Sequence, residues 1–422
     1  MAQVPAVEQI AVNQNRSAAG KLQNGILTVH LEIQRGAWRP EAEDGPQLFV
    51  QAFGEKGQPA QIPGPMLRVP AGTVVHATVT NTLKKKATVY GLNTRPGDKS
   101  AGVEVAAGES REFNFPAGAP GTYFYWARTV TDPPDLPVLA DAQLNGAFIV
   151  DSPGEVANDR VFLLNLMFVD ADALHGDEEV VSINGKSFPY TEPLEYRQGE
   201  TIRWRVINAG FFEHPMHLHG AFYKVLTLGD SESETAFAEP ERRLVVTQDL
   251  LGGHTMMMEW KPEHIGRWLF HCHFQGHMSI EERVPVITET QAPHYTTAAT
   301  ASHEQHGSMT TMNEMAGLVM SITVQPAKAN QLPAAESAAT RKIDLVVEPT
   351  ATAGKTPTFS CSVREGKKIV ASAEKVMGPP IVLTRGEPTE ITVTNHLAEA
   401  TTIHWHGLEL ESYYDGVIGG GT

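Results

Sequence analysis

The chain alternates short hydrophobic runs with polar turns, and helical periodicity is scarce along its length. One pattern occurs three times: a glycine, a strand-like run rich in β-branched and apolar residues, and an asparagine nine positions after the glycine. The three copies are GTVVHATVTN from Gly72, GETIRWRVIN from Gly199 and GEPTEITVTN from Gly386. Because β-branched residues favour strands and asparagine favours turns, each copy is predicted to be a strand followed by a loop. This recurrence predicts an all-β protein made of repeated domains.

Histidine pairs follow the asparagine in two of the three copies. His217 and His219 lie nine and eleven positions after the second asparagine, and His404 and His406 lie nine and eleven positions after the third. In the first copy, Tyr90 stands where the first histidine of the pair would be. The first repeat therefore lacks the pair that the other two carry.

A second correspondence joins the first and second repeats, between GTYFYWAR from Gly121 and GRWLFHCH from Gly266. It matches Trp126, Ala127 and Arg128 with His271, Cys272 and His273. The first repeat again lacks the metal-binding side chains. We predict a β domain without ligands at 1–153, a ligand-rich β domain at 154–330, and a partial third domain at 331–422. Between the last two, the polar segment 294–314 carries several histidines and methionines and is predicted to be a loop.

Composition narrows the classes of function. The chain has 422 residues, with 33 lysines and arginines against 49 aspartates and glutamates, a formal charge of −16. This charge repels nucleic-acid phosphates and anionic lipid surfaces, which argues against both as partners. No apolar stretch reaches the roughly 18 residues that a membrane-spanning helix needs. Only two cysteines are present, Cys272 and Cys361, so at most one disulfide could form. We expect none, because Cys272 is a candidate metal ligand.

The spacing of the histidines indicates two metal sites on one strand. His271 and His273 are two positions apart and point to one face of an extended strand, whereas Cys272 points to the other. On its own face, Cys272 with His214 and His277 is the ligand set of an electron-transfer copper with a weak axial methionine. On the opposite face, four histidines from the second domain and two from the third form an all-histidine cluster. Such a cluster is suited to several coppers and to dioxygen.

At these residues the sequence resembles the multicopper oxidases, the family that includes laccases and bacterial copper-efflux oxidases. Three of the family's four histidine blocks are present: HPMHLHG from His214, HCHFQGH from His271 and HWHG from His404. The resemblance implies tandem cupredoxin-like Greek-key domains, with β-sandwich or barrel folds. It also implies copper as the cofactor, dioxygen and a small reducing substrate as partners, and a periplasmic or secreted location.

The resemblance also implies a role for each motif residue. It assigns His214, Cys272 and His277 to the type 1 copper, and His217 and His404 to the type 2 copper. It assigns His219, His271, His273 and His406 to the type 3 pair. Asp415, in the segment YYDG, matches a family acid near the type 2 copper that helps to deliver protons, although Asp-Gly is also an ordinary turn pair.

Two methionines are candidates for the axial ligand of the type 1 copper. The family places a methionine or leucine ten positions after the cysteine, but that position here is Glu282. The segment EMAGLVMSITV resembles the family's usual continuation, so Met315 is the first choice and Met278 the second. Ordinary core packing is the alternative interpretation of Met315.

Two departures from the family pattern bear on assembly. The HWHG block normally belongs to the first domain, whereas here it comes last. His404 and His406 are therefore expected to meet the second domain either within one chain or between chains of a homotrimer, as in small laccases. The chain ends at Thr422, where the repeat predicts more strands and a fourth histidine block. With six of eight family cluster ligands, we expect type 1 copper and, unless another chain supplies the missing pair, an incomplete cluster.

The leading hypothesis is a laccase-type oxidase that couples one-electron oxidation of phenols, aromatic amines or metal ions to four-electron reduction of dioxygen. The soft ligands of 294–312 would suit cuprous ion as the substrate. A non-catalytic blue-copper electron-transfer or copper-binding protein is the alternative, but it would not need the histidines of the cluster. A copper nitrite reductase is a third option, against which His273, directly after the cysteine, counts.

Overall fold

The computed structural model describes residues 8–129, 143–154, 158–172, 176–278, 315–327, 341–350, 358–373 and 379–417. Within these ranges the helical elements are short 3-10 turns: η1 Glu239–Glu241, η2 Gln275–Met278 and η4 Ser412–Tyr414. None of the described helices is long and apolar enough to cross a membrane. The chain divides into two compact units, one of residues 1–326 with 405–422 and one of residues 327–404.

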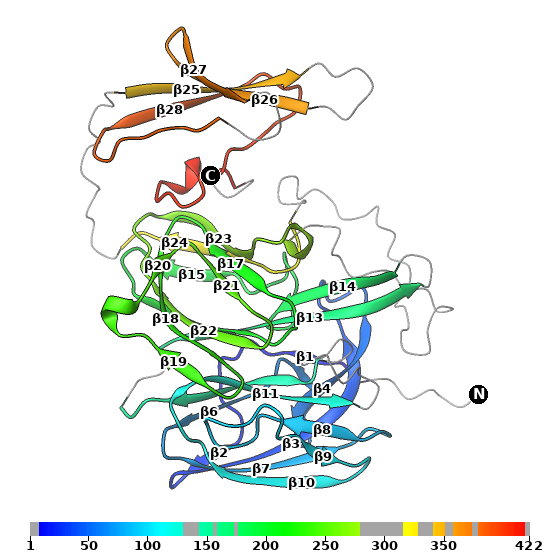
Figure 1. Ribbon diagram of the computed structural model, residues 1–422. Helices are drawn as coiled ribbons and strands as arrows, with labels where there is room; N and C mark the ends of the chain where they lie inside the picture. The colour runs from blue at the N-terminus through cyan, green and yellow to red at the C-terminus, as the bar shows by residue number, and fades with distance from the viewer. Residues whose placement is uncertain are drawn as a thin grey trace. The chain divides into compact units, whose positions relative to one another are not determined.

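The first unit begins with a β-sandwich (Figure 1, blue to cyan). One of its sheets has the order β1-β5-β4-β3-β7-β10, with β2 paired to β3, and the other has the order β6-β12-β11-β8-β9. The strands are β1 Ala11–Val12, β2 Lys21–Gln23, β3 Ile26–Trp38, β4 Leu48–Glu55, β5 Gln61–Ile62, β6 Gly64–Pro70, β7 Val74–Asn81, β8 Ala87–Tyr90, β9 Val103–Val105, β10 Ser110–Pro116, β11 Gly121–Thr129 and β12 Asn145–Asp151.

A second sandwich follows in the same unit (Figure 1, green to yellow). Its sheets have the orders β14-β13-β16-β22-β18-β19, with β20 paired to β18, and β15-β24-β23-β17-β21. The strands are β13 Arg160–Asp172, β14 Gly176–Ile183, β15 Leu194–Arg197, β16 Ile202–Asn208, β17 His214–Leu218, β18 Tyr223–Asp230, β19 Glu234–Ala236, β20 Leu244–Val245, β21 Thr247–Leu250, β22 His254–Trp260, β23 Gly266–Cys272 and β24 Val319–Gln325.

The other unit, 327–404, contains one four-stranded sheet with the order β27-β26-β25-β28. Its strands are β25 Arg341–Thr350, β26 Thr358–Glu365, β27 Lys368–Ala373 and β28 Thr389–Asn395. The parallel pair β25–β28 and the antiparallel pair β25–β26 repeat the pairings β3–β7 with β3–β4, and β13–β16 with β13–β14. The same chain path is therefore built three times.

The repeated glycine and asparagine have the same structural role in each copy. The glycines have φ angles of 87°, 80° and 85° at Gly72, Gly199 and Gly386, a left-handed conformation that side chains disfavour. Each asparagine donates from Nδ2 to the carbonyl four residues later and accepts the amide two residues later through Oδ1. The spacing is thus set by a turn before the strand and an asparagine turn after it.

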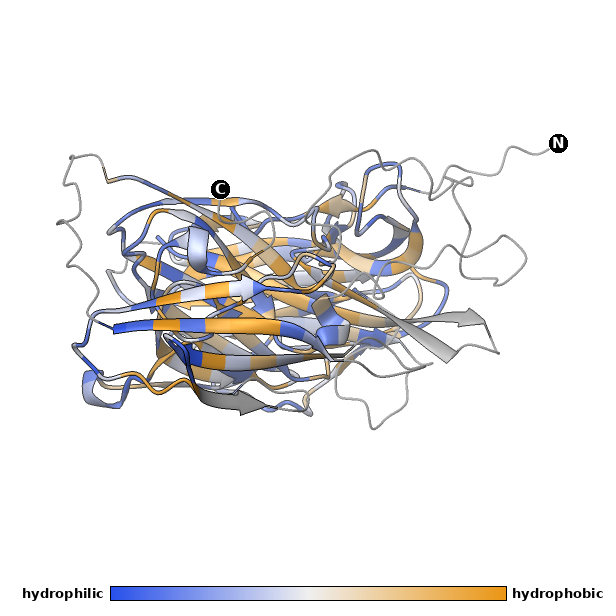
Figure 2. Cartoon of the chain, turned by 90° about the horizontal axis from the view of Figure 1, so that it is seen from above, coloured by the Kyte–Doolittle hydropathy of each residue, from blue (hydrophilic) through white to orange (hydrophobic). Residues whose placement is uncertain are grey.

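Hydrophobic residues recur along the strands (Figure 2), and their side chains form a buried core in each sandwich. Trp38 and Met167 belong to one buried cluster that joins the two sandwiches, and Trp126 and Leu163 belong to a second. The indole nitrogen of Trp38 also donates to the carbonyl of Gly185 at 2.9 Å. The two sandwiches are consequently one packed body.

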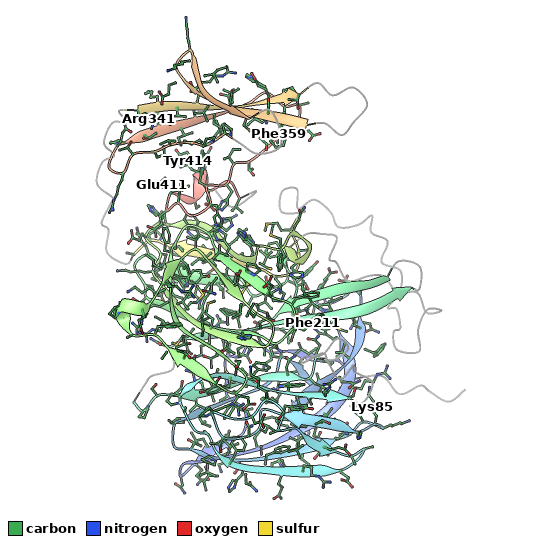
Figure 3. The ribbon with its side chains drawn as sticks, in the orientation of Figure 1. Lys85, Phe211, Arg341, Phe359, Glu411 and Tyr414 are labelled. Carbon is green, nitrogen blue, oxygen red and sulfur yellow. The ribbon has the colours of Figure 1, made fainter. Side chains whose placement is uncertain are left out.

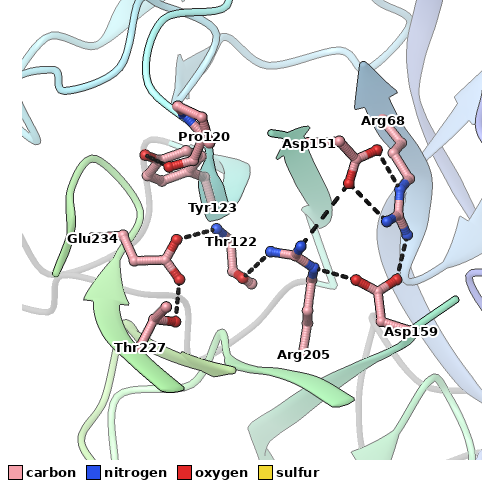
Figure 4. Close-up of polar contacts among 9 residues, drawn as sticks. All are labelled: Arg68, Pro120, Thr122, Tyr123, Asp151, Asp159, Arg205, Thr227 and Glu234. Atoms are coloured by element: carbon pink, nitrogen blue, oxygen red, sulfur yellow. Dashed lines mark hydrogen bonds and ion pairs between the residues drawn. The ribbon is translucent and has the colours of Figure 1, made fainter. Parts of the chain in front are cut away.

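A buried network of charges also crosses this boundary (Figure 4). Asp159 of the second sandwich accepts from Arg68 of the first at 2.6 Å and from Arg205 of the second at 2.6 Å. Arg68 also binds Asp151 through two nitrogens, and Arg205 donates to Thr122 at 2.8 Å. Both oxygens of Asp159 are therefore held by guanidinium groups, the arrangement in which a buried carboxylate is best compensated.

Candidate metal centre

Two adjacent strands of the second sandwich carry four of the motif residues, and His219 and His273 follow directly after them. β17 and β23 are antiparallel, with Met216 opposite Cys272 and His217 opposite His271. Because side chains alternate along a strand, Cys272 points into the sandwich while its neighbour His271 points away from it. The core of the sandwich contains Cys272 together with Met216.

The Cys272 side holds a compact set of three donors. The Nδ1 atoms of His214 and His277 lie 3.2 Å apart, and the sulfur of Cys272 lies 3.7 Å and 3.6 Å from them. The centre of such a triangle is about 2 Å from each corner, which is the length of a metal–nitrogen bond. All three side chains are buried. The donor set and its spacing fit a trigonal copper site.

Burial shifts the pKa values of two of these donors. It lowers the pKa of His214 to about 3, with a further contribution from the adjacent His277, so both nitrogens of this imidazole are uncharged at neutral pH. Burial raises the pKa of the Cys272 thiol to about 12, against the opposing effect of backbone amides. One of these amides, that of Phe274, lies 3.4 Å from the sulfur. Binding a cation at this thiol therefore releases a proton.

The opposite face of β23 belongs to a cluster of histidines. Ligand nitrogens of His217, His273 and His406 lie within 4.8 Å of one another, and so do those of His217, His219 and His271. The rings of His217 and His406 are stacked, with centroids 4.2 Å apart. Two three-nitrogen groups that share one histidine form a site with room for more than one metal ion.

Hydrogen bonds fix the direction in which three of these imidazoles point. His217 donates from Nδ1 to the carbonyl of Val246 at 2.8 Å, and His271 donates from Nδ1 to the carbonyl of Cys272 at 2.7 Å. The Nδ1 of His219 lies 2.6 Å from a carboxylate oxygen of the buried Asp415. In each case Nε2 remains as the metal-binding atom, since a neutral imidazole has one donor and one acceptor nitrogen.

Residues 405–417 reach this face within the same compact unit. Besides His406 and Asp415, the hydroxyl of Ser412 accepts the backbone amide of Arg267 at 3.1 Å. Gly266, which begins β23, makes room for this contact, because a Cβ there would lie 2.0 Å from the oxygen of Ser412. Figure 3 labels Glu411 and Tyr414, which belong to this segment. The absence of a side chain at Gly266 thus lets the segment that carries His406 pack against the start of β23.

We expect the substitution Gly266→Ala to displace this segment. The new methyl group would overlap Ser412, so His406 should leave His217, and copper bound beyond the first ion per chain should fall by more than about half. The blue absorption of the Cys272 site should remain. Metal analysis and absorption spectra of the copper-loaded variant measure both effects.

The double variant Gly266→Ala with Ser412→Gly is the control for this prediction. Gly266 has a φ of 132°, so alanine at this position also strains the backbone. The substitution Ser412→Gly relieves the overlap with the new methyl group but leaves that strain. Copper content should recover in the double variant. An unchanged copper content in the single variant would show that the contact does not support the cluster.

The roles of Met278, Met315 and His404 stay predictions. Met278 and Met315 both pack against the small cluster of Phe188, Leu269 and Val319, and the choice of axial ligand stays a prediction. His404 belongs to the second unit, so its role in the cluster also stays a prediction. The segment 294–314 lies outside the described residues.

Sequence reasoning missed the residues that support the ligands. Val246 and Ser412 act through a backbone carbonyl and a hydroxyl, which have no motif of their own. Gly220, the last residue of HPMHLHG, has a φ of 67°, and a Cβ there would lie 2.1 Å from the ring of Trp268. A glycine at the end of a ligand block is the one signal in the sequence that pointed to such a contact.

Comparison with known proteins bears on this arrangement. A family model described as multicopper oxidase matches residues 163–292, and a second with the same description matches residues 355–422. These two stretches of the chain are similar to multicopper oxidases. Copper is accordingly the cofactor that the two donor sets are suited to hold.

Solved structures show the same fold. A multicopper oxidase named mgLAC is similar with a TM-score of 0.51 and 19% identity, over 73% of this chain and 89% of that one. A blue copper oxidase from Nitrosomonas europaea is similar with a TM-score of 0.50 and 20% identity, over 70% of this chain and 85% of that one. The all-β, cupredoxin-like architecture predicted from the sequence is confirmed.

Curated relatives match over parts of their length. A probable nitrite reductase-hydroxylamine oxidoreductase fusion protein of Kuenenia stuttgartiensis is 27% identical over 59% of this chain and 30% of its own. The iron transport multicopper oxidase of Schizosaccharomyces pombe is 31% identical over 21% of this chain and 15% of its own. Copper resistance protein A of Escherichia coli is 28% identical over 25% of this chain and 16% of its own. The chain therefore spans less than a third of each of these relatives.

Proposed function

We propose that this chain is a multicopper oxidase that couples the one-electron oxidation of a small reducing substrate to the four-electron reduction of dioxygen to water, with the missing histidine pair of the cluster supplied by another chain. The reducing substrate is a phenol, an aromatic amine or a metal ion in a low oxidation state. The observation that carries the proposal is the position of Cys272 between His271 and His273. One strand contributes to a thiolate donor set on one face and to a histidine cluster on the other.

Bound copper would supply the electron storage and the dioxygen chemistry. His214, Cys272 and His277 would hold the type 1 ion, with Met315 as the proposed axial ligand. His217 and His404 would hold the type 2 ion, and His219, His271, His273 and His406 the type 3 pair.

The chain itself supplies the connection between the two sites. His271 and His273 are each one peptide bond from Cys272, and the hydrogen bond from Nδ1 of His271 to the Cys272 carbonyl adds a second link of 2.7 Å. Burial of the Cys272 set keeps water from the thiolate. A short, fixed backbone route is what electron transfer between the sites requires.

Asp415 orients His219 and is our candidate for holding a proton at the cluster. Its carboxylate is buried and lies 2.6 Å from Nδ1 of His219. Reduction of dioxygen to two waters consumes four protons, so an acid beside the cluster has a defined use. We assign Asp415 to that proton delivery.

A non-catalytic blue-copper carrier is less well supported. Such a protein needs only the Cys272 set, whereas this structure also gathers His217, His219, His271 and His273 with His406. The trimer and the periplasmic or secreted location implied by the family resemblance remain predictions.

Dioxygen uptake tests the proposed function. The copper-loaded chain is mixed with hydroquinone, and dioxygen consumption is followed together with hydrogen peroxide and with nitrite as a competing acceptor. We expect one dioxygen consumed per two hydroquinones, without peroxide, because four electrons are delivered at once. The variant His273→Ala, which keeps the Cys272 set, should bleach with substrate yet consume little dioxygen. Bleaching without dioxygen uptake in the unmodified chain would instead favour the carrier, and nitrite consumption would favour a nitrite reductase.

A further inference from the structure

One strand of the unit 327–404 lies at an open edge of its sheet. β28 is the last strand in the order β27-β26-β25-β28, and within the described part of the chain it pairs with β25 alone. The strands that match it in the glycine–asparagine repeat are central, because β7 lies between β3 and β10, and β16 lies between β13 and β22. Backbone groups point alternately to the two sides of a strand. About half of those of β28 therefore face an edge at which the described residues place no strand.

The apolar face of β28 is also more exposed than the same face in the other repeats. Val393 is 39% exposed, whereas Val79 and Val206, at the same repeat position, are fully buried. Ile391 lies on the same face, since it is two positions away. It is half-buried, whereas its counterpart Trp204 is fully buried. An apolar row that the other two repeats enclose thus reaches the open edge of this sheet.

The sequence of β28 lacks the features that protect an edge strand. Natural edge strands are short, or carry charges and proline that prevent pairing with another chain. β10 at the edge of the first sandwich has Arg111, Glu112 and Pro116, and the edge strands β9, β19 and β21 have three or four residues. β28 has seven residues, of which Glu390 is the only charged one and five are β-branched. It is therefore suited to accept another strand along its edge.

The strand is complementary to a second copy of itself. In an antiparallel pair of two β28 strands centred on Thr392, Ile391 of each copy lies opposite the partner's Val393 and on the same face. The apolar row then continues from one sheet into the other. A shift by one residue would put the partner's apolar side chains on the opposite face and interrupt the row.

The charges favour the same register. Centred on Thr392, the pair places Glu390 opposite the partner's Thr394, so the two glutamates are separated along the strands by about 13 Å. This exceeds the screening length of about 8 Å at physiological ionic strength. A pair centred on Ile391 would reduce the separation to about 7 Å, and one centred on Glu390 would place the glutamates opposite each other. The pairing about Thr392 therefore joins the apolar rows and keeps the glutamates apart.

We propose that β28 is a dimerisation edge, through which two copies of this chain join their four-stranded sheets by an antiparallel β28–β28 pair centred on Thr392. The partner is a second copy of the chain. The paired segment, 389–395, contains none of the proposed copper ligands. The association therefore depends neither on copper nor on the proposed oxidase activity. Because a single pair of strands forms a small interface, the dimer is expected to depend on protein concentration.

The test is sedimentation of the full chain at increasing concentration, combined with hydrogen exchange followed by mass spectrometry. We expect reversible dimerisation with a Kd below about 100 µM, equal with and without added copper. Amides of 389–395 should exchange at least about fivefold more slowly in the dimer than in the dilute monomer. A monomer at about 500 µM would overturn the proposal. Protection of 389–395 at every concentration would also overturn it, because the chain itself would then cover the edge.

The variant Val393→Lys tests the surface. Lysine at this exposed position adds a charge to the apolar row without opening the core, and it should weaken dimerisation at least about tenfold. Val103→Lys is the matched control, since Val103 is 40% exposed on the edge strand β9 of the first sandwich, and it should change nothing. Self-association that is unchanged in Val393→Lys would show that the copies meet elsewhere and would refute the assignment.

A pair of charge variants tests the register. Thr392→Asp and Thr392→Lys each place like charges opposite each other at the centre of the pair, and each should weaken dimerisation at least about fivefold. An equimolar mixture of the two variants should dimerise again, because opposite charges then face each other. Mixing would not repair a folding defect caused by either substitution. A mixture that stays monomeric would contradict the pairing about Thr392.

Discussion

Replacement of Cys272 by serine is expected to abolish the blue absorption of the copper-loaded chain and to lower substrate oxidation by at least about a hundredfold. The thiolate is the source of the charge-transfer band, and serine offers a far poorer ligand to copper. The two imidazoles of His214 and His277 would remain, 3.2 Å apart, with no sulfur to complete the triangle. Steady-state oxidation of hydroquinone measures the loss.

Cys361 provides the matched control, because it is the other cysteine of the chain and lies in β26 of the second unit. Cys361→Ser should leave the absorption and the oxidation rate unchanged. Retention of the band in Cys272→Ser, or its loss in Cys361→Ser, would contradict the assignment of the thiolate.

The substitution Asp159→Asn is expected to destabilise the protein by about 3–5 kcal/mol. Asp159 is nearly inaccessible and binds both Arg68 and Arg205 at 2.6 Å. Without its charge, two buried guanidinium groups would share Asp151 alone, and Arg205 is 3.9 Å from that carboxylate. Because the network crosses the boundary between the sandwiches, the first unfolding transition in urea should move to lower concentration.

Glu259→Gln is the control for this effect. Glu259 pairs with Arg203 at 2.7 Å across two strands of one sandwich, with both side chains partly exposed, and such pairs contribute about 1 kcal/mol or less. A loss of similar size in both variants would show that the buried network does not hold the sandwiches together.

The same network makes the stability of the folded protein depend on pH. Burial alone would raise the pKa of Asp159, but hydrogen bonds and charges from Arg68 and Arg205 lower it overall. A carboxyl group with a lowered pKa in the folded state stabilises the protein above its unfolded pKa of about 3.9, and the stabilisation is lost as the pH falls through the folded value. This acid-dependent loss should be absent in Asp159→Asn.

The repeat and the ligand blocks could be predicted from the sequence because each depends on local spacing. The glycine and asparagine nine positions apart mark a left-handed turn and an asparagine turn, and both are formed within one strand and its loops. The alternation of His271, Cys272 and His273 follows from strand geometry in the same way.

Contacts between distant segments could not be predicted. Ser412 meets Gly266, and Asp159 meets Arg68, across more than ninety residues in each case, and neither pair has a spacing that a sequence displays. The sequence shows Tyr90 and Trp126 at the positions that two cluster histidines have in the second repeat. This difference predicts only that the first sandwich lacks a metal site.

The absorption spectrum of the copper-loaded chain, recorded with a count of copper per chain, tests the central claim most directly. The claim is that Cys272, His214 and His277 form a blue copper centre on a strand whose other face joins the histidine cluster. We predict an intense thiolate band at about 600 nm with at least one copper per chain. Bound copper without that band would contradict the account.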